Sequence, residues 1–318
     1  MSKIITITFN PAIDKSTTVP VLMPEKKLRC TSPVYEPGGG GINVARAIKK
    51  LRGHATAIYL AGGCTGKAFA QLLEEEGINN SAIEINDSTR ENLIVLETAS
   101  HQQYRFGMPG PTINRTEWKN LLASVENEKN VGFIVVSGSL APGIPGDIYS
   151  RIAGIAQTKN AKLIVDTSGN ALKQAVQAGV YLIKPNLGEL GTLVGKNNLN
   201  IERVDEAARE VINSGKCEVV VVSMGAAGAM LVTHTIMEHI LPPAVKIQST
   251  VGAGDSMVAG IVFGLAQNKG IREAVRYGVA CGTAATINPG TELCRKKDAD
   301  HLFSLIQSRE VPGLNNSI

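Results

Sequence analysis

Short β-branched runs alternate with longer amphipathic segments along most of the chain. The runs end in turns rich in Gly, Asn, Ser or Asp and are predicted as strands at Ile4–Phe9, Phe133–Ser137, Leu163–Asp166, Tyr181–Ile183 and Val219–Ser223. Apolar residues at i, i+3, i+4 and i+7 predict helices at Gly41–Leu51, Lys67–Glu76, Thr116–Glu126, Ile201–Ser214 and Asp255–Gln267. Strands that alternate with helices indicate βαβ units, and therefore an α/β fold with a parallel sheet covered on both faces.

Two segments in the first half of the chain break this rhythm, because neither contains a crossover helix. Lys15–Glu36 is extended around Pro20 and Pro24, and Arg90–Phe106 is typical of two strands around a polar turn near His101. We expect a small antiparallel sheet that stands off the main layer as a flap over an active site; ordinary edge strands are the alternative. A sheet with one free face usually buries that face, which favours a partner subunit.

Composition narrows the class of protein. Of the 318 residues, 43% are hydrophobic and 19% are charged, which is typical of a compact chain rather than a disordered, collagen-like or coiled-coil one. We expect a single domain over residues 1–318, with the flap inserted at about residues 15–36 and 88–108. The net charge of +4, from 32 Lys and Arg against 28 Asp and Glu, gives little support for nucleic-acid binding.

Cysteine and histidine usage argues against disulfides and metal clusters. The five cysteines are odd in number and form no CxxC, and the five histidines show no metal-ligand spacing. The first apolar run is too short for a secretion signal, and no run is long enough to span a membrane. We therefore expect a cytoplasmic protein without membrane contact, and we expect residues 311–318 to be frayed.

The segment Ser249–Ser256, STVGAGDS, carries the strongest chemical signal. Its glycines let a backbone approach a ligand closely, and the N–H groups at the start of the next helix point at an anion. A carboxylate beside such a site repels phosphate unless it has a proton to collect, so Asp255 is a candidate general base. An aspartate that caps the helix is the alternative.

A second glycine-rich segment is Pro37–Ala47, PGGGGINVARA, with Asn43 on the first turn of a predicted helix. The entropic cost of four glycines favours a backbone-lined pocket for a polar ligand over a generic loop. The segment is not a dinucleotide loop, because Asn43 stands where the third glycine belongs. Gly66-Lys67 is followed by Ala68, so the chain has no P-loop either.

Further polar residues follow predicted strands. Asp14 lies beyond the first strand, at the sheet edge where α/β proteins bind ligands, and could accept hydrogen bonds from sugar hydroxyls. A turn aspartate is the alternative. After another strand, Glu189 could hold Mg²⁺ through water and Asn186 could face phosphate oxygens, although a helix cap would also explain an Asn-x-x-Glu sequence.

Four basic residues lie in the flap, namely Lys27, Arg29, Arg90 and Arg105. Guanidinium groups suit a phosphate dianion because their planar fork matches its oxygens. Solvated charges on edge strands are the alternative explanation for each of them.

Together these segments resemble the ribokinase-like PfkB carbohydrate kinases from Ile4 to about Leu305, with GGGGINVARA and STVGAGDS similar to the family's two signature regions. The resemblance implies a three-layer α/β/α sandwich with a mostly parallel, doubly wound sheet and a small β lid, which dimerises lid to lid. It also implies phosphoryl transfer from MgATP, with Asp255 as the base and Gly252, Ala253 and Gly254 as the anion hole.

The resemblance extends to the substrate. The stretch Glu25–Cys30, followed by PVYEPGGGGINVARAI, is similar to family members that phosphorylate the C1 hydroxyl of fructose 6-phosphate, giving fructose 1,6-bisphosphate in glycolysis. Relatives that act on tagatose 6-phosphate or on fructose 1-phosphate share the scaffold and remain alternatives. A non-catalytic sugar-phosphate sensor is a less favoured alternative from a different class.

The resemblance also implies roles for individual residues. By motif, the residues that bind the sugar are Asp14, Gly38, Gly39, Asn43 and Ser139. Those that bind the 6-phosphate are Arg90 and Arg105 together with Arg29, and Lys27 would reach the site from the other copy of a dimer. Residues for ATP are Lys184, Asn186, Ser223, Gly225 and Gly228, with Glu189 for Mg²⁺ through water. The positions where many relatives hold a monovalent cation such as K⁺ are Ser249, Val251, Ala285, Asn288 and Gly290.

Overall fold

The computed structural model describes residues 2–196 and 198–307, so the prediction for residues 311–318 lies outside the described residues. The strands of its larger sheet are β1 (Lys3–Thr8), β4 (Ala55–Ala61), β5 (Asn79–Glu84), β8 (Val131–Ser137), β9 (Lys162–Asp166), β10 (Val180–Ile183), β11 (Cys217–Ser223), β12 (Ala229–Val232) and β13 (Met237–Ile240). Their order is β13-β12-β11-β10-β9-β8-β1-β4-β5. Every neighbouring pair from β11 to β5 is parallel, and β12 and β13 add an antiparallel hairpin at one edge.

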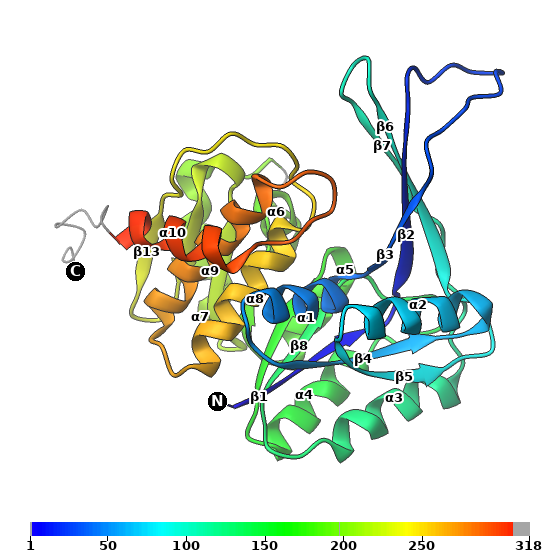
Figure 1. Cartoon of the computed structure of the whole chain (residues 1–318). Helices are drawn as coiled ribbons and strands as arrows, with labels where there is room; N and C mark the ends of the chain where they lie inside the picture. The colour runs from blue at the N-terminus through cyan, green and yellow to red at the C-terminus, as the bar shows by residue number, and fades with distance from the viewer. Residues whose placement is uncertain (1, 197, 308–318) are drawn as a thin grey trace.

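Helices cover both faces of this sheet (Figure 1). One face carries α3 (Arg115–Asn127), α4 (Ile148–Thr158), α5 (Gly169–Ala178), α6 (Leu187–Leu193) and α7 (Val204–Asn213). The other face carries α1 (Gly40–Lys50), α2 (Gly63–Glu75), α8 (Ala253–Ala266), α9 (Ile271–Thr286) and α10 (Lys296–Gln307). Short 3₁₀ turns lie at Ile201–Arg203 and Gly225–Ala227. The result is a three-layer α/β/α sandwich.

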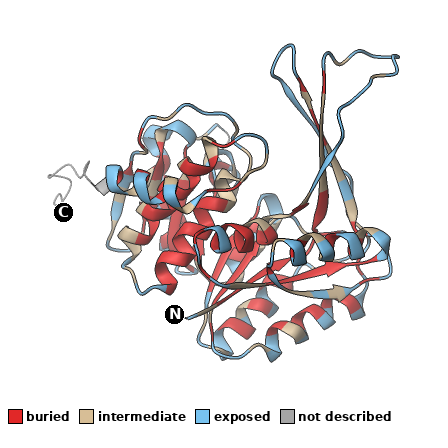
Figure 2. Cartoon of the chain, viewed as in Figure 1, coloured by how far each residue is buried: buried red, intermediate tan, exposed pale blue. Residues whose placement is uncertain are grey.

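The central strands are buried on both faces and are largely apolar, although β1 also buries Thr6 and Thr8. In β1, Ile5 and Ile7 pack on one helical layer and Ile4 packs on the other. β8 does the same with Ile134 on one face and Val135 on the other. Figure 2 shows these strands as the buried centre of the molecule. The side chains of a parallel sheet covered on both faces require this continuous apolar pattern.

A second sheet stands apart from the sandwich and is called the lid sheet here. Its strands are β2 (Ala12–Val19), β3 (Val34–Gly38), β6 (Arg90–Glu97) and β7 (Gln103–Phe106), in the order β3-β2-β6-β7. It projects from the body at the upper right of Figure 1. Because strand side chains alternate between faces, the pairing register puts Asp14, Asn92 and Arg105 on one face and Tyr104 and Phe106 on the other.

The three-layer sandwich with a separate small sheet confirms the predicted fold class. The small sheet is not wholly antiparallel as predicted, however, because its central strands β2 and β6 run parallel. Both strands leave the same edge of the main sheet and point outward, so they share a direction. The helix predicted at Ile201–Ser214 instead begins as a 3₁₀ turn, and the hairpin of β12 and β13 was not predicted.

Two further sequence expectations concern the whole chain. All five cysteines are free, with Cys30 and Cys64 exposed and the other three buried. Within residues 2–196 and 198–307, no helix combines the length and the apolar character that crossing a membrane requires.

Candidate active site

The candidate site lies at the carboxyl ends of β1 and β8. In the large sheet, the strand that follows β1 along the chain is β4, on one side, and the strand that follows β8 is β9, on the other side. The strand order therefore reverses between β1 and β8. Open α/β sheets bind ligands in the crevice at such a point. The first turn of α1 packs directly on it: a Cβ on Gly40 would lie 2.6 Å from the N of Gly138, and one on Gly41 would lie 2.5 Å from the O of Ile7. Only glycine permits this close approach.

Asp255 lies in the first turn of α8 and is paired with Asn43 of α1. The Asn43 Nδ2 donates to Asp255 Oδ2 over 2.9 Å, although the two residues are 212 positions apart. Burial raises the pKa of Asp255 to about 6, and the nearby Asp166 carboxylate adds to the rise, while the Asn43 hydrogen bond and Lys184 oppose it. A carboxylate with such a pKa is ionised at neutral pH and still basic enough to accept a proton.

Lys184 supplies a buried positive charge opposite the start of α8. It is 6% exposed, and its Nζ lies 3.3 Å from Asp166 Oδ1. A Cβ on Gly254 would lie 3.5 Å from the same Nζ, so the ammonium group faces the first turn of that helix. Burial lowers the pKa of Lys184, but the charges of Asp166 and Glu189 outweigh it and the net shift is upward. A fixed positive charge beside unpaired helix N–H groups suits anionic oxygens.

Asp166 is a site residue that the sequence reasoning missed. It ends β9, and its backbone O accepts a hydrogen bond from the N of Gly138 over 2.9 Å. Asp14 was selected because it is an acidic residue at the carboxyl end of a predicted parallel strand. Asp166 has the same position in the sequence pattern, so the same reasoning would have selected it.

Asp14 extends the site onto the inner face of the lid sheet. Its Oδ1 accepts a hydrogen bond from Asn92 Nδ2 over 2.9 Å. A Cβ on Gly38 would lie 2.7 Å from Asp14 Cγ, so the neighbouring strand must carry glycine there. Burial raises the pKa of Asp14, against the Asn92 hydrogen bond and the charge of Arg90. Gly39, with φ +116°, then turns the chain into α1.

Arg90 and Ser139 meet at Asn10, another residue that the sequence reasoning did not select. Arg90 Nη2 donates to Asn10 O and Nη1 donates to Met108 O, each over 3.0 Å, and Asn10 Nδ2 donates to Ser139 Oγ over 3.1 Å. Arg90 Nε and Asn10 Oδ1 are buried without a hydrogen-bond partner among the described residues. Buried polar groups are normally satisfied, so these two atoms are exceptions.

The other basic residues of the lid sheet lie farther out. Arg105 is opposite Ile94, on the same face as Asp14 but nearer the tip. Lys27 and Arg29 lie in the exposed loop between β2 and β3, at the end of β2 remote from Asp14. One copy of the chain therefore does not bring Lys27 or Arg29 to the site.

The residues assigned to ATP lie at the same edge, beyond β10 and β11. Asn186 caps α6 in a reciprocal arrangement: its Oδ1 accepts from Glu189 N, and Glu189 Oε2 accepts from Asn186 N, each over 2.9 Å. The capping alternative is thus realised, and Glu189 Oε1 is left out of the cap. Asn186 also pairs with Ser223, and Gly225 and Gly228 take positive φ of 60° and 87° in the turn that follows.

Of the five residues assigned to a monovalent cation, Ser249 and Val251 precede α8, Ala285 lies in the last turn of α9, and Asn288 and Gly290 lie in the turn that follows it. Ser249 Oγ donates to Gly290 O over 2.5 Å and accepts from Val251 N over 3.2 Å. Asn288 is 3% exposed, and its N donates to Ala285 O over 3.2 Å. Among the described residues, no group of three or more His, Cys, Asp or Glu side chains is placed to hold a metal ion. Any cation here would be bound by carbonyl and hydroxyl oxygens.

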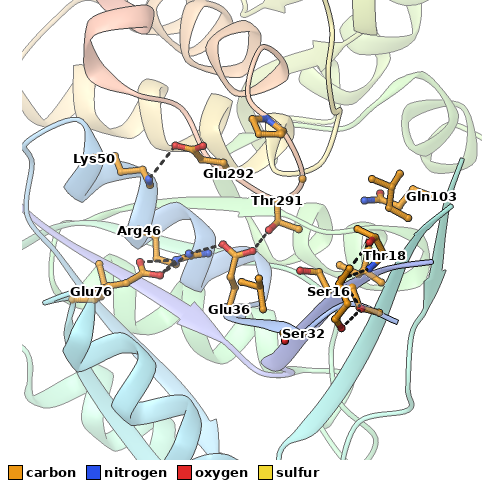
Figure 3. Close-up of a pocket in the computed structure, with 18 of the residues that line it drawn as sticks. Ser16, Thr18, Ser32, Glu36, Arg46, Lys50, Glu76, Gln103, Thr291 and Glu292 are labelled. Atoms are coloured by element: carbon orange, nitrogen blue, oxygen red, sulfur yellow. Dashed lines mark hydrogen bonds and ion pairs between the residues drawn. The ribbon is translucent and has the colours of Figure 1, made fainter. Parts of the chain in front are cut away.

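A pocket of about 910 Å³ lies between the lid sheet, α1 and residues 289–292 (Figure 3). Asp255 and Asn43 are not among its lining residues, and it adjoins the site through Arg46 and Glu36.

The sequence matches the pfkB family carbohydrate kinases over residues 5–298. The chain belongs to the PfkB family. Similar PfkB proteins include ATP-dependent 6-phosphofructokinase isozyme 2 of Escherichia coli strain K12, 46% identical over 96% of this chain and 99% of that protein. The isozyme 2 protein of Mycobacterium tuberculosis is 42% identical over 95% of this chain and 89% of that protein. The 1-phosphofructokinase of Bacillus subtilis strain 168 is 32% identical over 91% and 95%.

Solved PfkB structures match the whole fold. Phosphofructokinase-2 from Escherichia coli in complex with potassium has a TM-score of 0.93 and 46% identity, covering 96% of this chain and 100% of that one. The complex of that enzyme with fructose-6-phosphate has a TM-score of 0.91 with 44% identity, and its tetrameric inhibited form has 0.91 with 45%, at the same coverage. The resemblance stated from the sequence is confirmed.

Proposed function

We propose that this protein is an ATP-dependent kinase that phosphorylates the C1 hydroxyl of fructose 6-phosphate. The observation that carries the proposal is the pairing of Asp255 with Asn43 beside Lys184, at the crevice between β1 and β8. The similarity to the isozyme 2 proteins, which exceeds that to the 1-phosphofructokinase, supports fructose 6-phosphate over fructose 1-phosphate as the substrate. The intact site argues against the sensor alternative.

In this mechanism Asp255 accepts the proton of the C1 hydroxyl as its oxygen bonds to the γ-phosphorus of ATP. The bond from that phosphorus to the bridging oxygen breaks, and ADP leaves with the electron pair. Asp14 and Asn43 hold sugar hydroxyls, with Gly38, Gly39 and Ser139 beside them. Lys184 and the N–H groups of the Gly252–Gly254 turn stabilise the negative charge on the transferred group.

The sugar phosphate and the nucleotide lie on opposite sides of Asp255. Arg90 and Arg105 bind the 6-phosphate, the former from a position already fixed by the carbonyls of Asn10 and Met108. Asn186, Ser223, Gly225 and Gly228 line the ATP side.

The residues present fit magnesium carried by ATP. The carboxylates of Asp166 and Glu189 both raise the pKa of Lys184, and Glu189 uses only Oε2 in its helix cap. These two carboxylates would hold the ion through water, as Mg²⁺ prefers. The bound ion would neutralise charge on the phosphate groups.

A monovalent cation site is proposed between the two loops joined by Ser249 and Gly290, with carbonyls of Val251 and Ala285 and the buried Asn288 around it. Phosphofructokinase-2 from Escherichia coli has been crystallised in complex with potassium. Replacing KCl with tetramethylammonium chloride at constant ionic strength should then lower kcat. Equal rates in the two salts would exclude a required K⁺.

The chain is proposed to act as one kinase unit whose lid, about residues 15–36 and 88–108, joins two copies. The outer face of the lid sheet exposes Tyr35, Tyr104 and Phe106, at 44%, 37% and 45%. Apolar side chains on a projecting sheet favour burial against a second copy. The partner's lid loop would bring a second Lys27 and Arg29 near the 6-phosphate. An ATP-dependent sugar kinase of this kind would act in the cytoplasm.

The test is a comparison of kcat/KM with MgATP and fructose 6-phosphate, tagatose 6-phosphate and fructose 1-phosphate. A preference for fructose 6-phosphate of tenfold or more is expected. Asp255→Asn should still bind the sugar but lose nearly all turnover with each of the three substrates. A preference for another sugar phosphate would leave the proposed mechanism in place but contradict the proposed substrate. No turnover with any of them would favour the sensor.

A further inference from the structure

Arg46 of α1 is a buried arginine whose side chain joins several parts of the site. It is 6% exposed. Its Nε donates to both carboxylate oxygens of Glu76, at 3.0 and 2.8 Å, and its Nη2 donates to Glu76 Oε1 over 2.6 Å. Its Nη1 donates to Pro37 O over 3.1 Å and to Asn43 Oδ1 over 3.4 Å. Figure 3 shows Arg46 between Glu76 and Glu36.

The contact with Asn43 decides which way its amide points. An amide offers an acceptor oxygen at one end and donor N–H groups at the other, whereas a guanidinium only donates and an ionised carboxylate only accepts. With Arg46 on one side and Asp255 on the other, Oδ1 must face Arg46 and Nδ2 must face Asp255. The reverse orientation would place two donors together and two acceptors together.

We propose that Arg46 is a positioning residue for phosphoryl transfer, which holds Asn43 in the orientation that donates to the Asp255 carboxylate. This inference rests on the function proposed above. None of the described contacts of Arg46 reaches Asp255, so Arg46 acts on that carboxylate through Asn43. The same guanidinium holds the carbonyl of Pro37, next to Gly38, and thereby fixes α1 against the lid strand that borders Asp14.

The bidentate ion pair with Glu76 explains why Arg46 can be buried, but it does not require the contact with Asn43. Glu36 is a second carboxylate that holds Arg46: its Oε1 accepts from Arg46 Nη2 over 3.3 Å, and Thr291 Oγ1 donates to its Oε2. An arginine reaches all of these partners because its donors diverge in one plane. A lysine has the same charge but only one nitrogen, which cannot serve Glu76 and Asn43 together.

The charged groups that face Asp255 are Asp166 from the end of β9, Lys184 from beyond β10 and Asp14 from the lid sheet. Arg46 also acts on the charge of Asp14, and Arg46→Lys keeps that positive charge. Loss of the Asn43 hydrogen bond removes an interaction that lowers the pKa of Asp255, so the acid limb of the kcat/KM profile should move to higher pH.

The experiment compares the full-length protein with its Arg46→Lys and Glu76→Gln variants. We expect Arg46→Lys to lower kcat about five- to tenfold, as for one lost hydrogen bond, with a smaller effect on KM. Its acid limb should move upward by about half a pH unit or more. Glu76→Gln weakens the ion pair and lowers the thermal midpoint but retains the Asn43 contact, so its pH profile should match the unmodified protein.

A second measurement does not depend on turnover. The titration of Asp255 is followed by ¹³C NMR of aspartate-labelled protein, with the resonance assigned by Asp255→Asn. Arg46→Lys should raise the titration midpoint of Asp255, and it should have no further effect in an Asn43→Ala background. A midpoint unchanged by Arg46→Lys, or a shift equal to that of Glu76→Gln, would overturn the positioning role. Failure of the proposed kinase activity would leave this NMR result interpretable.

Discussion

Gly38→Ala tests whether the Asp14 carboxylate grips the sugar. A Cβ at this position would lie 2.7 Å from Asp14 Cγ, whereas ordinary contact begins at 3.4 Å. The carboxylate must therefore move by roughly 0.7 Å or more, since the backbone of β3 is held by its pairing with β2. That movement breaks the 2.9 Å hydrogen bond from Asn92 and misplaces the oxygens that would accept sugar hydroxyls.

Hydrogen bonds to a charged group are each worth about 1.5–3 kcal/mol. Loss of one such bond to fructose 6-phosphate should lower kcat/KM about 10- to 150-fold, mostly through KM. The assay is initial-rate kinetics with fructose 6-phosphate, alongside calorimetric binding of the sugar. Gly107→Ala is the matched control, because a Cβ there meets nothing within 4 Å and the glycine also lies in the lid segment.

The double variant Asp14→Ala with Gly38→Ala makes the test specific. If Gly38 acts only by leaving space for the carboxylate, Gly38→Ala should cost little in a chain that already lacks it, so the two effects will not add. Additive losses, or a Gly38→Ala enzyme as active as Gly107→Ala, would refute the reasoning.

Three further predictions address the base, the buried cation and the lid. Asp255→Asn should lower kcat by about 10²–10⁴-fold. The pKa of Asp255 is raised to about 6 in the folded protein, so between pH 4 and pH 6 the folded state binds more protons than the unfolded chain. As the pH rises through this range, ionisation of the buried carboxyl lowers the free energy of unfolding, and the loss is complete above pH 6. Asp255→Asn should therefore raise Tm more at pH 8 than at pH 4, and equal shifts would contradict the raised pKa. Lys184→Met leaves Asp166 without its ion pair and should lower the free energy of unfolding by about 3 kcal/mol in urea, with weaker ATP binding; an unchanged midpoint would count against the buried pair. Tyr104→Glu combined with Phe106→Glu should dissociate the oligomer in light scattering, whereas Met237→Glu, at an exposed position on β13, should not; an unaltered mass for the lid variant would place the interface elsewhere.

The sequence predicted the elements that depend on local pattern. Continuous apolar runs require strands buried on both faces, and the glycines before α1 and α8 can be understood from the backbone approach that they permit. The motif around Asp255 identified the base candidate for the same reason, since a helix start and its glycines are neighbours in the chain. The parallel pairing of β2 with β6 could not be predicted, because it depends on where two separate insertions leave the sheet.

Only the tertiary structure decided which side chains meet. Asn43 and Asp255 are 212 positions apart, and Lys184 reaches Asp166 from a different strand end. Arg46 reads in the sequence as one more polar position on an amphipathic helix. Its contact with Asn43 joins neighbours three residues apart on α1, but the packing of α2 and β3 brings Glu76 and Pro37 to the same guanidinium. Local patterns are set by interactions over a few residues, whereas these contacts are set by the packing of whole elements. The candidate base of the proposed reaction could therefore be identified from the sequence, whereas the geometry of the site depends on the tertiary structure.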